Sequence, residues 1–292
     1  MRFEMDIKSE NIDGDDTLKM NKIIIDPSRR KRQLINWREL WRYKDLFWFL
    51  IKRDIKTKYA QSILGIGWAI IQPVFSMIVF TIVFGNLAKV SSEGVPYALF
   101  SYTALVPWTY FSNSLTSSSS SLLASKKMIT KVYFPRLVVP IVPVLATLVD
   151  FSVSLLILIG MLIWFGFIPS LGSLFIPLFV LLMTLAASGL GMWLTALAIQ
   201  YRDIRYGLNF FVRLLMYISP VIYATSSVPE KYQIFYALNP LVGVIEGFRA
   251  VLLNTQKIPW DFLGIGTLMA TILFVTGAIY FRKMENKFAD VA

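Results

Sequence analysis

Long uncharged blocks alternate with short charged stretches along most of this chain. Six blocks are long and largely apolar. They span residues 63–87, 97–123, 137–165, 174–199, 208–225 and 260–281. About 20 apolar residues in a helix are enough to cross a hydrocarbon core roughly 30 Å thick. Because a membrane interior offers backbone N–H and C=O groups no other partners, each block is predicted to be a transmembrane helix.

Composition supports the same class of protein. Of the 292 residues, 56% are hydrophobic and only 16% are charged, whereas a soluble domain carries about 25% charged residues. The strands of a membrane β-barrel would be shorter and would alternate in polarity. The predicted fold is therefore an all-α polytopic membrane protein with six transmembrane helices, in a domain that covers residues 63–292.

The residues before the first block divide into two parts. Residues 1–36 are polar with little periodicity, and we predict a mobile N-terminal tail. Residues 37–62 interleave Trp, Phe and Leu with Lys and Arg. That pattern is typical of an amphipathic helix lying in the membrane interface.

The segment 226–258, between the fifth and sixth blocks, is moderately apolar but is interrupted at Asn239-Pro240. Proline removes a helical hydrogen bond and disfavours helix at the residue before it. The two remaining pieces are too short to cross a membrane. We predict a re-entrant helical hairpin, and a loop resting on the membrane surface is the alternative.

Charge is distributed unevenly among the segments that join the blocks. The chain has 29 Lys/Arg and 18 Asp/Glu, a net charge of +11. That excess lies in the N-terminal segment, the connections at 124–136 and 200–207, and the C-terminal tail, whereas the other connections are neutral overall. Basic residues stay on the cytoplasmic side of a membrane. Both termini and the 124–136 connection are therefore predicted to be cytoplasmic.

The connection SKKMITKVYFPR, at 125–136, carries four positive charges and no acid. As a helix it would place apolar residues along one side at i, i+4 spacing, and Pro135 would end it. We predict a short amphipathic helix on the cytoplasmic face, with Tyr133 and Phe134 filling a partner's pocket. The alternative is an ordinary basic loop whose side chains reach the headgroups.

Few side chains in the blocks carry chemistry. The chain contains no Cys and no His, which removes thiol nucleophiles and the commonest metal ligand, and no metal site is expected. We place only two charges within the spans, Asp150 and Arg213. Intramembrane charges are costly and are functional candidates by default. Arg213 is expected near the start of its span, and a mutual ion pair is one interpretation.

Seven stretches, in order, resemble those of one known family. They are LGIGWAIIQP (64–73), VFG (83–85), LVPWTYFSNSL (105–115), KVYFPRLVVP (131–140), YRDIRYG (201–207), SPVIYA (219–224) and LNPLVGVIEGFR (238–249). From about Leu40 to its C-terminus the chain resembles the membrane permease subunit of a bacterial polysaccharide ABC exporter, of the type-2 ABC permease family. That family exports lipid-linked O-antigen, capsular polysaccharide or teichoic acid.

The resemblance implies a set of partners. In that family two permeases form a homodimer, and two separate ATPase subunits that use ATP and Mg dock beneath it. No Walker motif GxxxxGK(S/T) occurs in this chain. ATP chemistry is therefore expected on the separate subunits, and neither a cofactor nor an enzymatic activity is expected of this chain. No nucleic-acid partner is expected either, because membrane topology accounts for the basic charge. The expected location is the bacterial cytoplasmic (inner) membrane, among membrane lipids.

The resemblance also implies roles for particular residues. The coupling helix that enters an ATPase groove would comprise Lys126, Lys127, Met128, Ile129, Lys131, Val132, Tyr133, Phe134, Pro135 and Arg136. The hairpin would form an external gate containing Pro229, Asn239, Pro240, Gly243, Glu246, Gly247 and Arg249. A glycan path needs aromatic faces and hydroxyls, and the candidates in the second block are Tyr102, Trp108, Tyr110, Phe111, Ser114 and Ser117. Membrane anchoring and close helix packing are the alternative roles for this last group.

Three other functions remain open at this stage. A related permease could export a drug, a small lipid or teichoic acid, and the identity of its ATPase partner would distinguish it. An integral-membrane glycosyl- or phosphotransferase needs carboxylates or bound metal at the membrane face, where this chain has few acids. A proton-coupled transporter is disfavoured because the spans hold almost no acids and no histidine.

Overall fold

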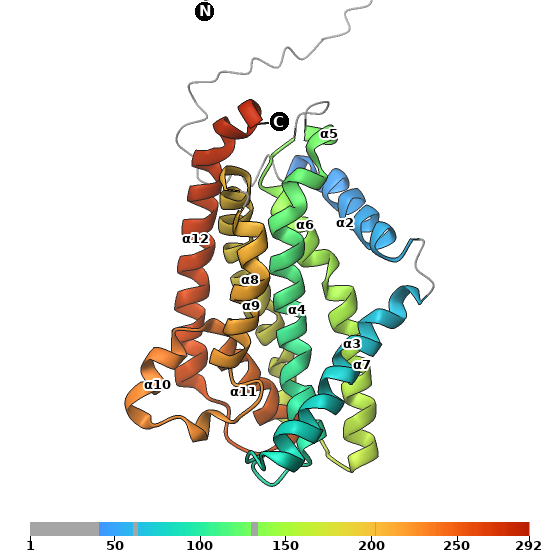
Figure 1. Cartoon of the computed structure of the whole chain (residues 1–292), viewed down its shortest axis with the longest axis vertical. Coiled ribbons are helices and arrows are strands. Elements are labelled where there is room, and N and C mark those ends of the chain that lie inside the picture. Colours follow the sequence, from blue (N-terminus) through green and yellow to red (C-terminus); the bar gives the residue numbers. More distant parts are fainter. Residues whose placement is uncertain (1–40, 61–63, 130–133, 202, 292) are drawn as a thin grey trace, which may run out of the picture. The chain divides into compact units, whose positions relative to one another are not determined.

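The computed structural model describes residues 41–60, 64–129, 134–201 and 203–291, and every regular element within those ranges is a helix (Figure 1). The helices are α2 (Lys44–Tyr59), α3 (Trp68–Phe80), α4 (Tyr97–Ala124), α5 (Lys126–Ile129), α6 (Val138–Ala146), α7 (Leu148–Phe165), α8 (Ile176–Gln200), α9 (Asp203–Ile218), α10 (Glu230–Ala237), α11 (Pro240–Leu253) and α12 (Trp260–Val291). The all-α prediction is confirmed for these ranges. The predicted tail at 1–36 lies outside them.

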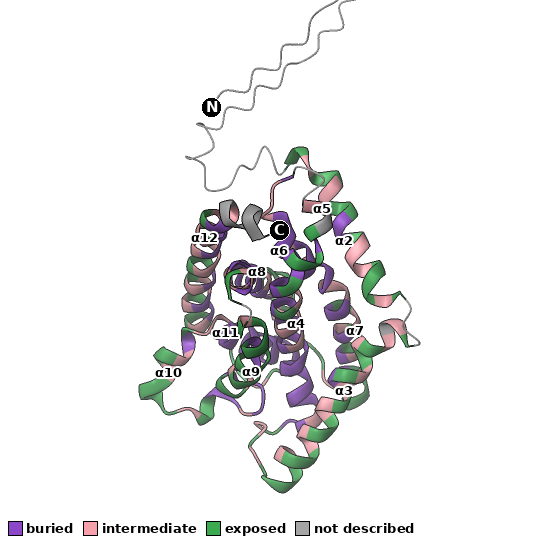
Figure 2. Cartoon of the chain, turned by 45° about the horizontal axis from the view of Figure 1, so that its top comes forward, coloured by how far each residue is buried: buried purple, intermediate pink, exposed green. Residues whose placement is uncertain are grey.

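Helix α4 is the centre of the bundle, and it contacts α3, α6, α7, α8, α9 and α11 (Figure 1). Most of its length is buried (Figure 2). Its many hydroxyls tolerate burial because they donate to backbone carbonyls of the preceding turn. The Thr103 hydroxyl, for example, lies 2.8 Å from the Leu99 carbonyl. The helix predicted at 97–123 is confirmed almost to the residue.

Two of the predicted spans are interrupted. The block at 137–165 forms α6 and α7, which meet at Thr147. Pro143 lies inside α6 and has no N–H to donate to the preceding turn. The first block forms α3, which contains Pro73, and continues as a π-helical segment at Thr81–Leu87. Each block is one apolar stretch in sequence but two helical pieces in the structure.

The fifth block is displaced from its predicted position. Helix α9 runs from Asp203 to Ile218, whereas the apolar block at 208–225 predicted a later start and end. Pro220 follows shortly after the helix end, where proline cannot continue it. Arg213 therefore lies ten residues after the start of α9, roughly 15 Å along the helix, and is exposed. The depth of Arg213 in a membrane span stays a prediction.

The connections gather in two groups. In the first group, the Tyr97 hydroxyl at the start of α4 donates to the Ile222 carbonyl (2.7 Å), and Asn254 Nδ2 donates to the Ile168 carbonyl after α7 (2.9 Å). We call this group, with α10 and α11, the α10 end. In the other group, Arg136 Nη1 donates to the Glu285 carbonyl at 2.9 Å. We call that group, with α5 and the C-terminal part of α12, the α5 end; the two groups lie at opposite ends of the bundle (Figure 1).

Helices α8 and α12 pack through small residues. A Cβ atom on Gly189 would lie 2.5 Å from the backbone nitrogen of Phe274 on α12. Gly277 faces the Gly189 carbonyl in the same way from the other helix. Glycine at both positions lets the two backbones approach, as is usual between helices in membranes.

Among the described residues, four helices are long and apolar enough to cross a membrane: Trp68–Leu87, Val138–Phe165, Leu171–Gln200 and Trp260–Glu285. The pair α10 and α11 passes the same test only when joined, and it is bent by 107°, as in a broken span or a re-entrant loop. Helix α4 has 28 residues but is rich in serine, and α9 has only 16 residues. The molecule is thus a helical bundle with four or five candidate spans by length and composition.

Candidate functional site

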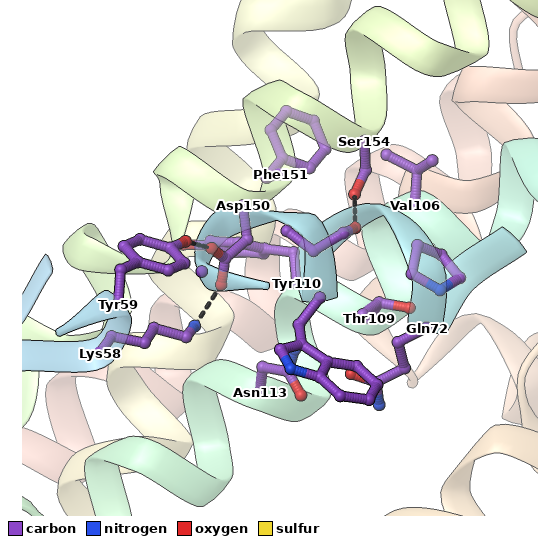
Figure 3. A pocket seen from close by; sticks show the side chains of 14 residues that line it. Lys58, Tyr59, Gln72, Val106, Thr109, Tyr110, Asn113, Asp150, Phe151 and Ser154 are labelled. Atoms are coloured by element: carbon purple, nitrogen blue, oxygen red, sulfur yellow. Dashed lines mark hydrogen bonds and ion pairs between the residues drawn. The ribbon is translucent and has the colours of Figure 1, made fainter. Parts of the chain in front are cut away.

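A buried carboxylate joins helix α7 to helix α2. Asp150 lies in the first turn of α7 and is 7% exposed. The Lys58 ammonium and the Tyr59 hydroxyl, at the C-terminal end of α2, both bind its carboxylate (Figure 3). A buried carboxylate is costly unless it is paired and hydrogen-bonded. These contacts therefore hold the end of α2 against the bundle, and Lys58, rather than Arg213, is the partner of Asp150.

A cavity of about 120 Å³ lies beside Asp150, between α2, α3, α4 and α7 (Figure 3). Gln72, Thr109 and Asn113 line it, and the side chains of these three residues have no hydrogen-bond partner among the described residues. Trp68 also lines it and is 55% exposed, so its ring is accessible. The cavity thus combines free amide and hydroxyl groups with an indole ring.

One face of α4 carries small polar side chains that the bundle leaves exposed or half-buried, which are Thr109, Ser112, Asn113, Thr116, Ser117 and Ser120. We call it the polar face of α4, because residues three and four apart lie on one side of a helix. Thr109 and Asn113 line the first cavity, whereas Ser117 and Ser120 line a second one of about 180 Å³. Residues of α2 line both cavities. Two polar cavities therefore lie along one face of α4, next to α2.

Of the aromatic residues predicted for a glycan path, Tyr110 lines the first cavity, whereas Tyr102, Trp108 and Phe111 line neither cavity. Tyr102, Trp108, Tyr110 and Phe111 are buried against neighbouring helices, as is Ser114. The Tyr110 hydroxyl lies 2.9 Å from Thr184 Oγ1 of α8, and the ring packs edge-on against Phe151. This burial favours the alternative role in helix packing. Among the six candidates, only Ser117 lies on the polar face.

No sequence pattern described above singles out Gln72, Thr109 and Asn113. A usable signal was present, since Thr109, Asn113 and Ser117 follow one another at intervals of four residues along α4. Hydroxyl groups occur on every side of this helix, however, so the sequence alone does not show which face is left open by the neighbouring helices. The free side chain of Gln72 could not be located without knowing how α3 packs on α4.

The predicted coupling segment is described only in part, because residues 130–133 lie outside the described ranges. The four residues Lys126–Ile129 are helical as α5. Phe134 is 3% exposed and packs with Phe281 and Met284 of α12. The prediction that its ring fills a partner's pocket is therefore wrong for Phe134. Arg136, near Pro135, binds the Glu285 carbonyl, so this part of the segment is tied to α12.

A buried ion pair lies in α11. Arg249 Nη1 is 3.1 Å from Glu246 Oε1, and the two residues are 0% and 1% exposed. The same Glu246 oxygen accepts hydrogen bonds from the Thr225 nitrogen (3.1 Å) and hydroxyl (2.8 Å), and Gln256 binds the other oxygen. The Arg249 guanidinium stacks 3.6 Å from the Phe100 ring centroid. Glu246 and Arg249 thus pair within one helix, at i, i+3 spacing.

The Arg249 guanidinium extends the network to the connection before α10. Its nitrogens donate to the Val221 and Tyr223 carbonyls at 3.2 and 3.3 Å. Buried charges need such a set of hydrogen bonds to offset their desolvation. The pair therefore fixes the 219–227 connection to α11, which is itself buried from Leu241 to Leu253.

The other hairpin residues shape its turn and its packing. Asn239 caps α11, since its Oδ1 accepts from the Leu241 nitrogen at 3.1 Å, and Pro240 occupies the first turn. Pro229 precedes α10. A Cβ on Gly243 would lie 2.8 Å from the Phe262 backbone of α12, whereas one on Gly247 would lie 3.0 Å from the Phe179 ring of α8. The two glycines thus face different helices.

These features define the class of the protein. It is a bundle of apolar helices of membrane-spanning length, with charges concentrated at the two ends and a polar face on its central helix. Within the described residues, no group of three or more His, Cys, Asp or Glu could hold a metal ion. Such a molecule is a helical membrane protein. Residues 45–253 match the ABC-2 type transporter family, and the chain belongs to that family.

Several relatives cover most of the chain. It is 28% identical over 248 residues to an O-antigen export system permease protein RfbA of Klebsiella pneumoniae, covering 85% of this chain and 95% of that protein. An RfbA of Myxococcus xanthus is 25% identical, covering 87% and 97%. The polysialic acid transport protein KpsM of Escherichia coli is 24% identical, covering 81% and 92%. The predicted resemblance to polysaccharide exporter permeases is confirmed.

Proposed function

We propose that this chain is the transmembrane subunit of an ATP-driven exporter that moves a lipid-linked polysaccharide, of O-antigen or capsular type, across the bacterial cytoplasmic membrane. Family membership and the names of the relatives support a transport permease. The observation that carries the proposal further is the polar face of α4. It gives an apolar bundle one surface that suits a hydroxyl-rich chain.

We infer six membrane passes. Helices α4 and α9 join the four apolar candidates because both cross the bundle between its α5 end and its α10 end (Figure 1). The described connections at the α5 end carry the basic residues Lys126, Arg136 and Arg282. The positive-inside rule then makes the α5 end and both termini cytoplasmic. Helix α2 would lie in the cytoplasmic interface, and α10 with α11 would form an external re-entrant hairpin.

The translocation path would follow the polar face of α4 and would be closed by a second copy of the chain. Homodimerisation is supported by the unpartnered side of that face, since a single chain leaves Thr116 and Ser120 exposed. Many weak contacts suit a moving substrate better than one tight site, as in ion conduction. The aromatic core of α4 would then keep the helix straight and in register.

ATP and Mg would be bound by two separate ATPase subunits. They would dock at the α5 end, where the four residues of α5 begin the predicted coupling helix. The basic residues at the α5 end would help the ATPase subunits to dock and would also keep this end on the cytoplasmic side of the membrane.

A deletion strain tests the function. Removing the gene should trap the finished, lipid-linked glycan inside the cell, and expression of the chain should restore surface glycan. Fractionation followed by glycan analysis measures both. If surface glycan remains normal, the polysaccharide substrate is wrong and the alternative of a drug or small-lipid exporter gains support. If no glycan is made at all, the alternative of a glycosyl- or phosphotransferase is favoured.

A further inference from the structure

The cavity beside Asp150 is electrically balanced. Among its lining residues only Lys58 and Asp150 carry charge, and these two bind each other (Figure 3). A phosphate or diphosphate group would need a cationic surplus to offset its own desolvation. The cavity offers none, so its chemistry favours a neutral ligand.

The free groups of the cavity match a polyhydroxylated ligand. The amides of Gln72 and Asn113 each donate and accept hydrogen bonds, and so does the hydroxyl of Thr109. None of the three is used by another described residue. Gln72 is exposed and Thr109 and Asn113 are half-buried, so these groups are open to an incoming partner. They can bind either water or a ligand.

The accessible ring of Trp68 distinguishes these two occupants. Water does not need an aromatic surface, whereas a sugar has an apolar C–H face that packs on one. A water molecule needs only about 10–15 Å³ of cavity volume, and this cavity of about 120 Å³ is several times larger. It has room for a ring-sized group.

We propose that this cavity is a binding subsite for one neutral sugar residue of the exported glycan. The proposal rests on the export function proposed above. Trp68 packs on the C–H face of the sugar, and Gln72, Thr109 and Asn113 bind its hydroxyls. Asp150, held in place by Lys58 and Tyr59, presents its remaining acceptor capacity to the same ligand. Because Thr109 and Asn113 belong to the polar face of α4, the subsite opens onto the proposed path.

A single introduced thiol reports occupancy of the subsite. The chain has no cysteine, so Asn113→Cys in the full chain gives one labelling position. Membranes are prepared from cells that make the glycan and from cells blocked in its synthesis. A water-soluble maleimide should label Asn113→Cys at least about three-fold more slowly when glycan is present. A sugar held by a few hydrogen bonds would cover the thiol for most of the time and block the reagent. Asn86→Cys, exposed on the π-helical segment, is the control and should label equally in both.

Equal labelling of Asn113→Cys in the two membranes overturns the subsite. Addition of inorganic diphosphate to the glycan-free membranes separates sugar from anion binding. Protection by diphosphate, with none from glycan, would replace the proposal with an anion site.

Export rates provide an independent readout. Trp68→Ala should lower export per membrane-inserted permease about five-fold, the loss expected for one or two weak contacts, and Trp68→Tyr should restore most of it by keeping an aromatic face. Trp164→Ala, 86% exposed near the far end of α7, should leave the rate unchanged. If Trp68→Ala lowers only the amount of inserted protein, Trp68 is a membrane anchor and the proposal fails.

The subsite and the export function can fail separately. If the deletion strain traps glycan but glycan does not change the labelling rate of Asn113→Cys, the export function is supported and the subsite is wrong. If the deletion strain exports glycan normally, both fall.

Discussion

Asp150 and Lys58 form a pair whose two members have unequal surroundings. The Asp150 side chain is 10% exposed, whereas the Lys58 side chain is 40% exposed. Removing Lys58 leaves a buried carboxylate without its counter-ion. Removing the charge of Asp150 leaves a lysine that can extend into water along its flexible stem. The pair therefore stabilises the fold mainly because it neutralises the buried carboxylate of Asp150.

The first prediction follows from that asymmetry. Lys58→Met should lower the free energy of unfolding by about 1–2 kcal/mol, the cost of an unpaired buried charge discounted for the exposure of the lysine. Asp150→Asn should cost less, since the amide still binds Tyr59. Thermal unfolding of the purified chain in detergent measures both. The double variant should be more stable than Lys58→Met alone, and a double variant that is worse would contradict the pairing.

Adjacent residues of the coupling segment should behave differently. Phe134→Ala should reduce the amount of folded permease, because truncating a buried Phe costs about 3–5 kcal/mol. Tyr133→Asp, if Tyr133 enters an ATPase pocket as the sequence suggests, should leave insertion intact and abolish export by placing a charge in an apolar contact. Export per inserted permease and copurification of the ATPase distinguish the two. Normal export in the Tyr133→Asp variant would reduce the segment to a basic loop.

At the scale of elements, helix limits are predicted best where a long apolar run is bounded by turn residues. Helix α4 begins after Pro96, and its limits match the sequence interpretation. Helix α9 was misplaced because its first turn, from Asp203, is polar and therefore fell outside the apolar block. The break between α6 and α7 was also missed, since the residues on both sides of Thr147 are equally apolar. Hydropathy locates membrane segments, and helix ends depend on local backbone chemistry.

The contact between α8 and α12 gives an element-scale prediction. Gly189→Leu should separate the two helices and sharply reduce the folded yield, because its Cβ would overlap the Phe274 backbone. Gly160→Leu on α7 is the matched control, since no atom lies within 4 Å of a Cβ there. Detergent-resistant yield after size-exclusion chromatography compares them. Equal yields would mean that α8 and α12 do not pack as described.

At the scale of the whole molecule, the asymmetric charges and the two groups of connections make the same topological prediction by separate routes. In this cysteine-free chain, Ser92→Cys and Glu230→Cys should react with an impermeant thiol reagent outside intact cells. Ile204→Cys should react only after the membrane is permeabilised. Labelling of Ile204→Cys in intact cells would contradict the orientation proposed from the positive-inside rule.

The candidate site was less predictable than the fold. The sequence correctly singled out Asp150 as an unusual charge, but its partner Lys58 is 92 residues away in the chain, and no periodicity links them. The aromatic residues of α4 are candidates for their chemistry, yet they are buried against neighbouring helices, and Tyr110 alone among them lines the cavity beside Asp150. Which face of a central helix is open depends on all of its neighbours at once. That information is tertiary.

The network around Glu246 also sets an order of events during translation. Helix α11 leaves the ribosome before Gln256 and the whole of α12, so Glu246 and Arg249 have only part of their hydrogen bonds at that moment. Two charges in a 14-residue helix disfavour its independent entry into lipid. Gly243 likewise gains its neighbour only when Phe262 has been synthesised. Helix α11 should therefore reach its buried position last, and a chain that is truncated before residue 260 and released into the membrane should leave it open to protease.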